Sequence, residues 1–200
     1  MFLKRRNNRL ILKYISVSVF ALPLKLAFRA RGQRSFFMDK ITTATELEKY
    51  ISENRTGRKI VFTNGCFDLI HSGHIRLLQF AASCGDVLIV GINSDSSVKR
   101  LKGDKRPIVP ENERAEVLAA LACVDFVTVF SEDTPCSLIE RIRPDIHVKG
   151  GDYDMDKIPE AAVIRSYGGR MERFSFVEGH SSTNIIGRVL DAYGNTERSV

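Results

Sequence analysis

The sequence predicts an α/β fold in which helices cover both faces of a five-stranded parallel sheet. Beyond residue 57, strand-like apolar runs alternate with helix-like runs. Such alternation is typical of a parallel sheet flanked by helices. The strand-like runs are short and continuously apolar, as expected for strands that are buried on both faces. Right-handed crossovers between them then give a doubly wound sheet.

The individual elements follow this alternation along the chain. Strands are expected at residues 59–62, 87–92, 126–130, 146–148 and 173–177. Helices are expected at residues 43–54, 74–84, 96–101, 111–123, 135–142, 159–167 and 182–190. Pro110 and Pro135 suit the first turn of the helices that they precede or open, and Pro144 ends the helix before it.

Composition divides the chain at residue 37. The 200 residues carry 30 Lys and Arg against 24 Asp and Glu, a formal charge of +6. Nine of the basic residues and none of the acids lie in residues 1–37, which leaves residues 38–200 with 21 basic residues against 24 acids. The predicted domain, residues 38–200, is therefore mildly acidic, and a broad nucleic-acid surface is not expected.

Residues 1–37 are predicted to form a basic N-terminal extension. Their longest uncharged run, residues 14–24, has eleven residues, whereas a membrane-spanning helix needs about 20. The pattern fits a signal peptide, an organelle transit peptide, or upstream codons before a true start at Met38. We favour the start at Met38, because the chemistry indicated below uses cytoplasmic nucleotides.

Four cysteines without paired spacing also indicate reduced thiols and a cytoplasmic protein.

The most informative segment is residues 63–74, T-N-G-C-F-D-L-I-H-S-G-H, which joins the first predicted strand to a helix. Two histidines, His71 and His74, stand three apart, with Gly73 just before the second. Free backbone N–H groups and the helix dipole make such a helix start a phosphate site. The alternative is a metal site, but two histidines do not complete a zinc site.

Polar residues follow the other predicted strands as well. In an open parallel sheet, ligands bind at the carboxyl ends of the strands. The segments N-S-D at 93–95, K-G-G-D-Y at 149–153 and E-G-H-S-S-T-N at 178–184 are expected to meet there. The last segment opens a helix with hydroxyl residues, which predicts either a phosphate site or an ordinary helix cap.

A basic loop, residues 99–107, lies between two predicted helices. Lys102, beside Gly103, and Arg106, beside Pro107, are better placed to meet phosphates than their solvated neighbours. Arg114, on the next helix, either reaches the same site or lies on the helix surface.

Together these segments resemble the HxGH nucleotidylyltransferase superfamily, in particular its cytidylyltransferase-like branch. The resemblance covers about residues 59–189 and is greatest to the D-glycero-β-D-manno-heptose 1-phosphate adenylyltransferases, which occur as separate chains or as the second domain of bifunctional heptose kinase/adenylyltransferases. S-E-D-T-P at 131–135 and K-G-G-D-Y at 149–153 favour this heptose branch. Glycerol-3-phosphate cytidylyltransferases share the first signature and an S-T-rich last motif.

The resemblance implies a Rossmann-like sheet of the HxGH type and transfer of AMP from ATP to heptose 1-phosphate. The products would be ADP-heptose, which serves lipopolysaccharide inner-core synthesis, and pyrophosphate. Mg²⁺ is expected to accompany ATP. We also expect a homo-oligomer and a separate heptose kinase in the pathway. A CTP-dependent enzyme acting on glycerol 3-phosphate and a non-catalytic nucleotide-binding module remain alternatives.

Site residues are assigned on the same resemblance. The expected catalytic residues, which meet the triphosphate and the transition state, are His71, His74 and Lys102. The expected nucleotide-binding residues are Thr63, Asn64, Gly65, Cys66, Phe67, Asp68, Gly73, Lys149, Gly150, Asp152, Ser181, Ser182 and Thr183. The expected substrate-binding residues are Asn93, Asp95, Arg106 and Arg114. No metal ligand is assigned.

Overall fold

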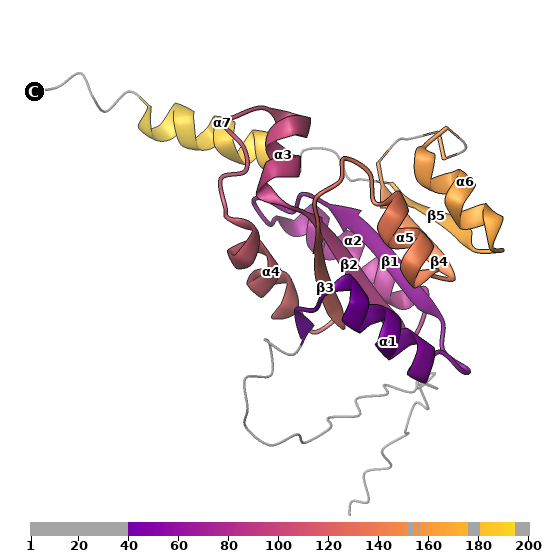
Figure 1. Cartoon of the computed structure of the whole chain (residues 1–200). Helices are drawn as coiled ribbons and strands as arrows, with labels where there is room; N and C mark the ends of the chain where they lie inside the picture. The colour runs from indigo at the N-terminus through magenta and orange to yellow at the C-terminus, as the bar shows by residue number, and fades with distance from the viewer. Residues whose placement is uncertain (1–39, 152–153, 156, 176–180, 195–200) are drawn as a thin grey trace, which may run out of the picture. The chain divides into compact units, whose positions relative to one another are not determined.

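A five-stranded, all-parallel sheet forms the centre of the fold (Figure 1). The computed structural model describes residues 40–151, 154–155, 157–175 and 181–194. Its strands are β1 (Ile60–Gly65), β2 (Val87–Asn93), β3 (Phe126–Phe130), β4 (Ile146–Gly150) and β5 (Arg170–Phe174), in the order β3-β2-β1-β4-β5. The first strand, β1, thus lies in the middle of the sheet. The later strands are added outward from it, first β2 and β3 on one side and then β4 and β5 on the other. This order confirms the doubly wound sheet predicted from the sequence.

Helices lie on both faces of this sheet. α2 (Ser72–Ser83) and α4 (Glu111–Ala119) contribute to one hydrophobic cluster, whereas α1 (Ala44–Asn54), α5 (Cys136–Ile142) and α6 (Pro159–Ser166) contribute to the other. The two remaining helices in the described part of the chain are α3 (Asp95–Lys102), which directly follows β2, and α7 (Ser182–Tyr193). None of the described helices is both long and apolar enough to cross a membrane.

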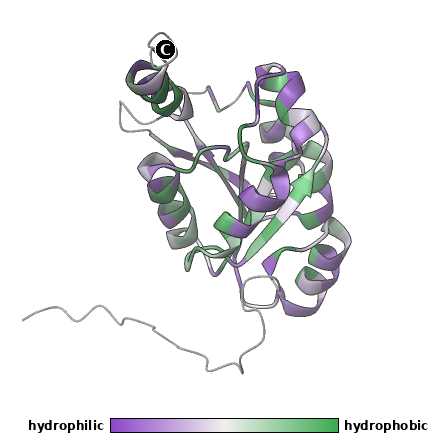
Figure 2. Cartoon of the chain, turned by 90° about the vertical axis from the view of Figure 1, so that its left-hand side faces the viewer, coloured by the Kyte–Doolittle hydropathy of each residue, from purple (hydrophilic) through white to green (hydrophobic). Residues whose placement is uncertain are grey.

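The alternation of side chains along each strand supplies both clusters. In β1, Val61 packs with the α2 and α4 side, while Ile60 and Phe62 pack with the α1, α5 and α6 side. All seven residues of β2 are buried. Figure 2 shows hydrophobic colouring along much of the central strands, whereas the helices around them carry both hydrophobic and hydrophilic residues. Each large aliphatic side chain buried in this way stabilises the fold by about 1.5–3 kcal/mol.

The predicted position of the last strand was wrong by three residues. β5 spans Arg170–Phe174 rather than 173–177. The backbone N–H of Arg170 donates to the carbonyl of Asp145 (3.0 Å), and this contact starts the ladder with β4. An edge strand needs no continuous apolar run, because it is covered less completely than the central strands. The run F-S-F-V at 174–177, in which three of four residues are apolar, was therefore a misleading signal.

Two proline positions also differ from the prediction. Pro110 and Pro135 are the N-cap residues of α4 and α5 rather than members of the first turn. The helix predicted at residues 74–84 begins earlier, at Ser72, with His71 as its N-cap. The predicted extension, residues 1–37, lies outside the described residues.

We expect Gly91→Ala to destabilise the protein by about 1–3 kcal/mol, because β2 and the side chain of Phe62 leave no room for a methyl group. A Cβ at Gly91 would lie 2.7 Å from the Phe62 ring. Urea unfolding of wild type and variant measures the difference. Gly187→Ala on α7 is the control, since a Cβ there meets no atom within 4 Å, and it should leave stability unchanged or slightly raised. Equal effects of the two substitutions would contradict the packing described for β2.

Candidate functional site

A pocket of about 320 Å³ opens at the carboxyl edge of the sheet. It is lined by residues from the ends of β1, β2 and β4 and from the adjoining helices. The predicted site residues that line it are Asn64, Gly65, Cys66, Phe67, His74, Asn93, Lys102, Lys149 and Gly150. The pocket thus gathers segments that are up to 96 residues apart in the sequence, from Asn64 to Glu160. This edge is where an open parallel sheet binds ligands.

The turn from β1 into α2 is sharp and is centred on Phe67. This residue has φ 45°, in the left-handed region, although its side chain is 3% exposed and belongs to the core. A non-glycine residue in this region costs on the order of 1 kcal/mol, which burial of the aromatic ring offsets. A Cβ at Gly65 would lie 3.2 Å from the same ring. Gly65 and Phe67 together shape one wall of the pocket.

The two histidines of the motif stack on one another at the start of α2. Their ring centroids lie 3.8 Å apart at an interplanar angle of 28°, and the ring of Phe67 lies 5.1 Å from that of His74. Burial lowers the pKa of His74 to about 4, and the positive charges of His71 and Lys102 act in the same direction. His74 is therefore neutral at pH 7. Its Nδ1 is buried and has no hydrogen-bond partner among the described residues.

Lys102 is the last residue of α3 and is exposed at the pocket rim. Gly103, with φ 90°, ends the helix there. Residues 99–102 of the predicted basic loop therefore belong to α3, and residues 103–107 form the loop itself. A flexible, solvated ammonium at the rim suits contact with a phosphate group, since a lysine acts as a mobile point charge.

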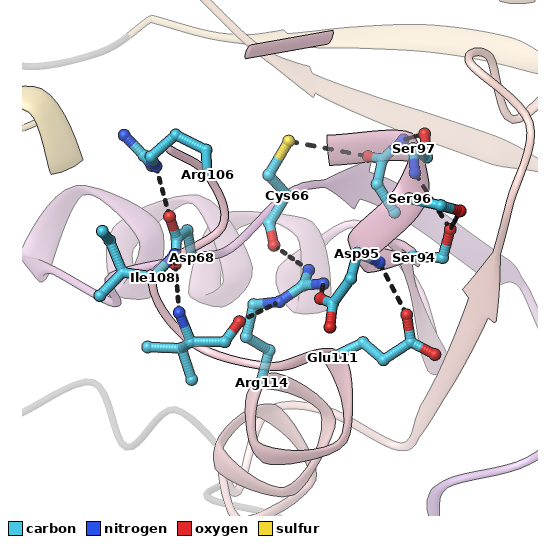
Figure 3. Close-up of polar contacts among 12 residues, drawn as sticks. Cys66, Asp68, Ser94, Asp95, Ser96, Ser97, Arg106, Ile108, Glu111 and Arg114 are labelled. Atoms are coloured by element: carbon cyan, nitrogen blue, oxygen red, sulfur yellow. Dashed lines mark hydrogen bonds and ion pairs between the residues drawn. The ribbon is translucent and has the colours of Figure 1, made fainter. Parts of the chain in front are cut away.

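Asp68 holds the basic loop against the β1–α2 turn (Figure 3). Its carboxylate accepts from Arg106 Nε (2.5 Å) and from the backbone N–H groups of Ile108 (2.8 Å) and Val109 (2.9 Å). Burial alone would raise the pKa of this carboxyl, but the three hydrogen bonds outweigh it and lower the pKa. In this arrangement Arg106 is bound to protein rather than directed to the pocket. Its predicted contact with substrate stays a prediction.

Arg114 is the most completely enclosed charged residue near the site, with 1% exposure. Its guanidinium donates to the Cys66 carbonyl (2.5 Å), the Val109 carbonyl (2.9 Å) and the Asp95 carboxylate (2.7 Å) (Figure 3). These contacts tie α4 to the β1–α2 turn, the basic loop and the start of α3. Arg114 therefore does not lie on the helix surface, and it does not line the pocket. Its partner is Asp95, which was also predicted to bind substrate. The predicted contacts of both residues with substrate stay predictions.

A chain of polar side chains runs beneath the pocket from β1 to α6. His147 Nε2 lies 3.1 Å from Asn64 Oδ1, and Lys149 Nζ lies 3.4 Å from the same oxygen and 2.6 Å from Glu160 Oε1. The lysine and glutamate side chains are 17% and 5% exposed, and His147 is fully buried. Burial lowers the pKa of His147 to about 3, with a smaller contribution from Lys149.

The remaining predicted residues occupy three kinds of position. Thr63 and Gly73 are buried and do not line the pocket. Asn93 is buried and donates to the Ser97 hydroxyl (3.0 Å). Asp152 lies outside the described residues, as do residues 178–180 of the last motif.

The start of α7 lies beside the histidine segment. The Ser182 hydroxyl donates to the carbonyl of Leu69 (3.2 Å). Ser181 is the N-cap of α7, and its hydroxyl accepts from the backbone N–H of Asn184 (3.1 Å). Thr183 is exposed. Ser181 therefore forms the ordinary cap considered above, and the contact from Ser182 brings a second helix start close to the first.

Sequence reasoning missed three residues that line the pocket, Asp133, Pro135 and Glu160, and also His147, which contacts the pocket residue Asn64. Asp133 and Pro135 lie in the S-E-D-T-P segment, which was singled out only as a family signal. Glu160 had no signal that distinguished it from an ordinary acid in the first turn of a helix, and His147 reads as one residue of a buried strand. Their roles depend on the pairing of β1 with β4, which residue types alone do not specify.

Residues 62–188 match the family model described as Cytidylyltransferase-like. Over 143 residues the chain is 56% identical to the bifunctional protein HldE of Geobacter sulfurreducens and 57% identical to that of Geobacter metallireducens. Each alignment covers 72% of this chain but 29% of the relative. The chain therefore spans less than a third of the curated relatives that it matches.

Two solved structures are also similar. A lipopolysaccharide core biosynthesis protein from Thermoplasma volcanium is 30% identical, with a TM-score of 0.50, and the match covers 60% of this chain and 98% of that one. A pantoate-beta-alanine ligase from Francisella tularensis, with a TM-score of 0.52, is 14% identical, and the match covers 73% of this chain and 75% of that one. The second likeness shows the shared fold alone.

We expect Arg114→Met to destabilise the protein by about 2–4 kcal/mol, because it leaves two carbonyls and a carboxylate without their donor. Thermal and urea unfolding measure the change. Arg100→Met is the matched control: Arg100 also pairs with a carboxylate, that of Asp133 (2.8 Å), but its side chain is 49% exposed. Arg100→Met should lower the free energy of unfolding by less than about 1 kcal/mol. A small effect at Arg114 would contradict its role as a tie between the three segments.

We expect the stability of the protein to fall as the pH drops from 7 to 5, partly through His74. Its folded-state pKa, about 4, lies below the ordinary value of 6.5. The unfolded chain therefore takes up a proton in this range while the folded chain does not, so the stabilisation present at pH 7 is lost on acidification. His74→Gln should reduce this loss by up to about 2 kcal/mol. Urea unfolding at both pH values tests this, and an unchanged pH dependence in the variant would contradict the buried neutral state.

Proposed function

Because the chain belongs to the cytidylyltransferase-like family, we propose that it is a nucleotidyltransferase that transfers AMP from ATP to a sugar phosphate. The observation that carries the proposal is the pair of stacked histidines at the start of α2. His74 faces the pocket, is neutral, and has a ring nitrogen without a protein partner. Lys102 also lines the pocket and is exposed at its rim.

The reaction needs positioning and charge stabilisation rather than a protein nucleophile. An oxygen of the sugar phosphate attacks the α-phosphorus of the nucleotide, and the bond to the pyrophosphate oxygen breaks. The attacking oxygen is already anionic, so no strong base is required. The enzyme must hold two anions in line and neutralise the charge that develops on the leaving group.

The residues at the pocket suit these tasks. The start of α2 offers free backbone N–H groups and the positive end of its dipole to phosphate oxygens. A neutral His74 donates one N–H without the desolvation cost of a buried cation. The charges of His71 and Lys102 lower the pKa of His74. A bound triphosphate would counteract these positive charges. His74 would then take up a proton more readily as negative charge develops on the leaving pyrophosphate. Lys102 would neutralise phosphate charge, and Ser182 with Thr183 would contact the β- and γ-phosphates.

D-glycero-β-D-manno-heptose 1-phosphate is the acceptor that we propose, with ADP-heptose and pyrophosphate as products. Three observations support it. The S-E-D-T-P and K-G-G-D-Y segments contribute Asp133, Pro135, Lys149 and Gly150 to the pocket. The curated relatives are named bifunctional proteins, and this chain matches 29% of their length, as expected for the adenylyltransferase part of such a protein. One structural relative is named a lipopolysaccharide core biosynthesis protein.

Mg²⁺ would enter with the nucleotide. In the described part of the chain, no three histidine, cysteine or acidic side chains are grouped closely enough to hold a metal by themselves. This fits an ion held mainly by phosphate oxygens, which Mg²⁺ prefers, together with water. A cytoplasmic location, a homo-oligomer and supply of the acceptor by a separate kinase belong to the same proposal.

Release of pyrophosphate by the purified chain tests this function. ATP and CTP are each combined with D-glycero-β-D-manno-heptose 1-phosphate and with glycerol 3-phosphate. The first pair, ATP with the heptose phosphate, should exceed CTP with glycerol 3-phosphate by at least about two orders of magnitude in kcat/KM, since unpaired buried donors cost a few kcal/mol. Preference for CTP would overturn the adenylyl assignment, and no release with any pair would overturn nucleotidyl transfer.

Two lysines provide the matched variants for that assay, Lys102 at the end of α3 and Lys105 in the loop that follows it. Lys102→Ala should lower kcat by about a hundredfold, as expected for a group that stabilises developing charge. Lys105→Ala removes the same charge from an exposed position three residues away that does not line the pocket, and should stay within about twofold of wild type. Equal losses would indicate that the loop supplies only diffuse charge.

A further inference from the structure

Lys149 lies in the pocket wall but is already paired with a carboxylate. Its Nζ is 2.6 Å from Glu160 Oε1, and both side chains are largely enclosed. A lysine that is neutralised in this way adds little net attraction for a phosphate group. Its second contact, to Asn64 Oδ1 at 3.4 Å, points to a different use.

The contacts define which way the Asn64 amide faces. An ammonium group can only donate, so the Asn64 atom that faces Lys149 is the amide oxygen. His147 Nε2 lies 3.1 Å from the same oxygen, so this nitrogen carries the proton and donates. Both lone pairs of the oxygen are then used, and the NH₂ group is left on the other side. Asn64 lines the pocket, and its NH₂ group has no hydrogen bond to another described residue.

We propose that Glu160, Lys149 and His147 act as positioning residues that fix the Asn64 amide with its NH₂ group facing the pocket, where it binds an acceptor oxygen of the nucleotide. Glu160 orients the ammonium of Lys149, and Lys149 and His147 together hold the amide oxygen. The inference rests on the proposed function for the identity of the ligand. The arrangement selects an acceptor at this point of the pocket and rejects a donor, because a donor would meet the NH₂ group.

The packing around these residues keeps the arrangement rigid. His147 is fully buried in β4, and its ring lies 5.3 Å from the ring of Phe62 in the neighbouring strand. Glu160 lies in the first turn of α6 and is 4% exposed. The oxygen of Asn64 is therefore held from two elements, β4 directly and α6 through Lys149. A side chain held in this way loses little entropy when the ligand binds.

The first measurement needs no substrate. In protein labelled with ¹⁵N at asparagine, the side-chain amide signal of Asn64 should shift, and its hydrogens should exchange faster with water, in Glu160→Gln and in His147→Leu. His147→Gln keeps a donor near the position of Nε2 and should stay close to wild type. Glu48→Gln is the control, because Glu48 is also paired with a cation, Arg141 (2.8 Å), but does not line the pocket. An Asn64 signal that is unchanged in Glu160→Gln and His147→Leu would overturn the proposal.

The second measurement separates positioning from direct phosphate binding. Glu160→Gln and His147→Leu should raise the KM for ATP about tenfold, the effect of one weakened hydrogen bond, with kcat within about threefold of wild type. A direct phosphate contact by Lys149 predicts the opposite, since removing its carboxylate partner would free the ammonium and lower KM. A lowered KM would overturn the proposal, and an unchanged KM would overturn the part of it that concerns the nucleotide. If Glu160→Gln does not fold, the two His147 variants decide.

The two proposals fail in different ways. A wild-type chain that releases no pyrophosphate with any nucleotide and acceptor would overturn the proposed function. The amide signals of Asn64 would still decide whether the three residues hold its side chain. A shifted amide signal together with an unchanged KM would overturn the part of the inference that concerns the nucleotide.

Discussion

The guanidinium of Arg114 holds together the parts of the chain that form the pocket. Its partners come from the β1–α2 turn, the start of α3 and the loop that precedes α4. A charged group with several donors in a rigid plane can satisfy acceptors from three directions at once. Because the group is enclosed, breaking any one contact leaves a buried polar atom without a partner, which makes the arrangement cooperative.

The charges around the pocket are organised by the same principle. Arg106 is engaged by Asp68, Arg114 by Asp95 and Lys149 by Glu160, at 2.5, 2.7 and 2.6 Å respectively. Three of the cations predicted to bind nucleotide or substrate are thus already paired with carboxylates. Attraction for an anionic ligand then depends on the start of α2, on the exposed Lys102 and on the polarisable histidine pair.

Sequence reasoning reached the fold and the location of the site for a clear physical reason. Strand periodicity and motif position are local properties, and the carboxyl edge of a parallel sheet collects whatever follows its strands. The same reasoning assigned Arg114 to substrate or surface, because a residue type does not disclose its partners. It also missed Glu160 and His147, whose contacts depend on β1 pairing with β4 and on α6 packing nearby. The early start of β5 was missed because an edge strand does not need a continuous apolar run.

α7 differs from the other helices in that none of its twelve residues is buried. An isolated helix of this length is marginally stable in water, and one hydrogen bond links its first residue to the histidine segment. If phosphate groups bind between the starts of α2 and α7, they would hold α7 in place as well as the nucleotide. Part of the binding free energy would then be spent on ordering the chain, so affinity would be lower than the contacts suggest. Binding would also carry a more negative heat-capacity change than the pocket alone would give, because the apolar side of the helix would lose contact with water.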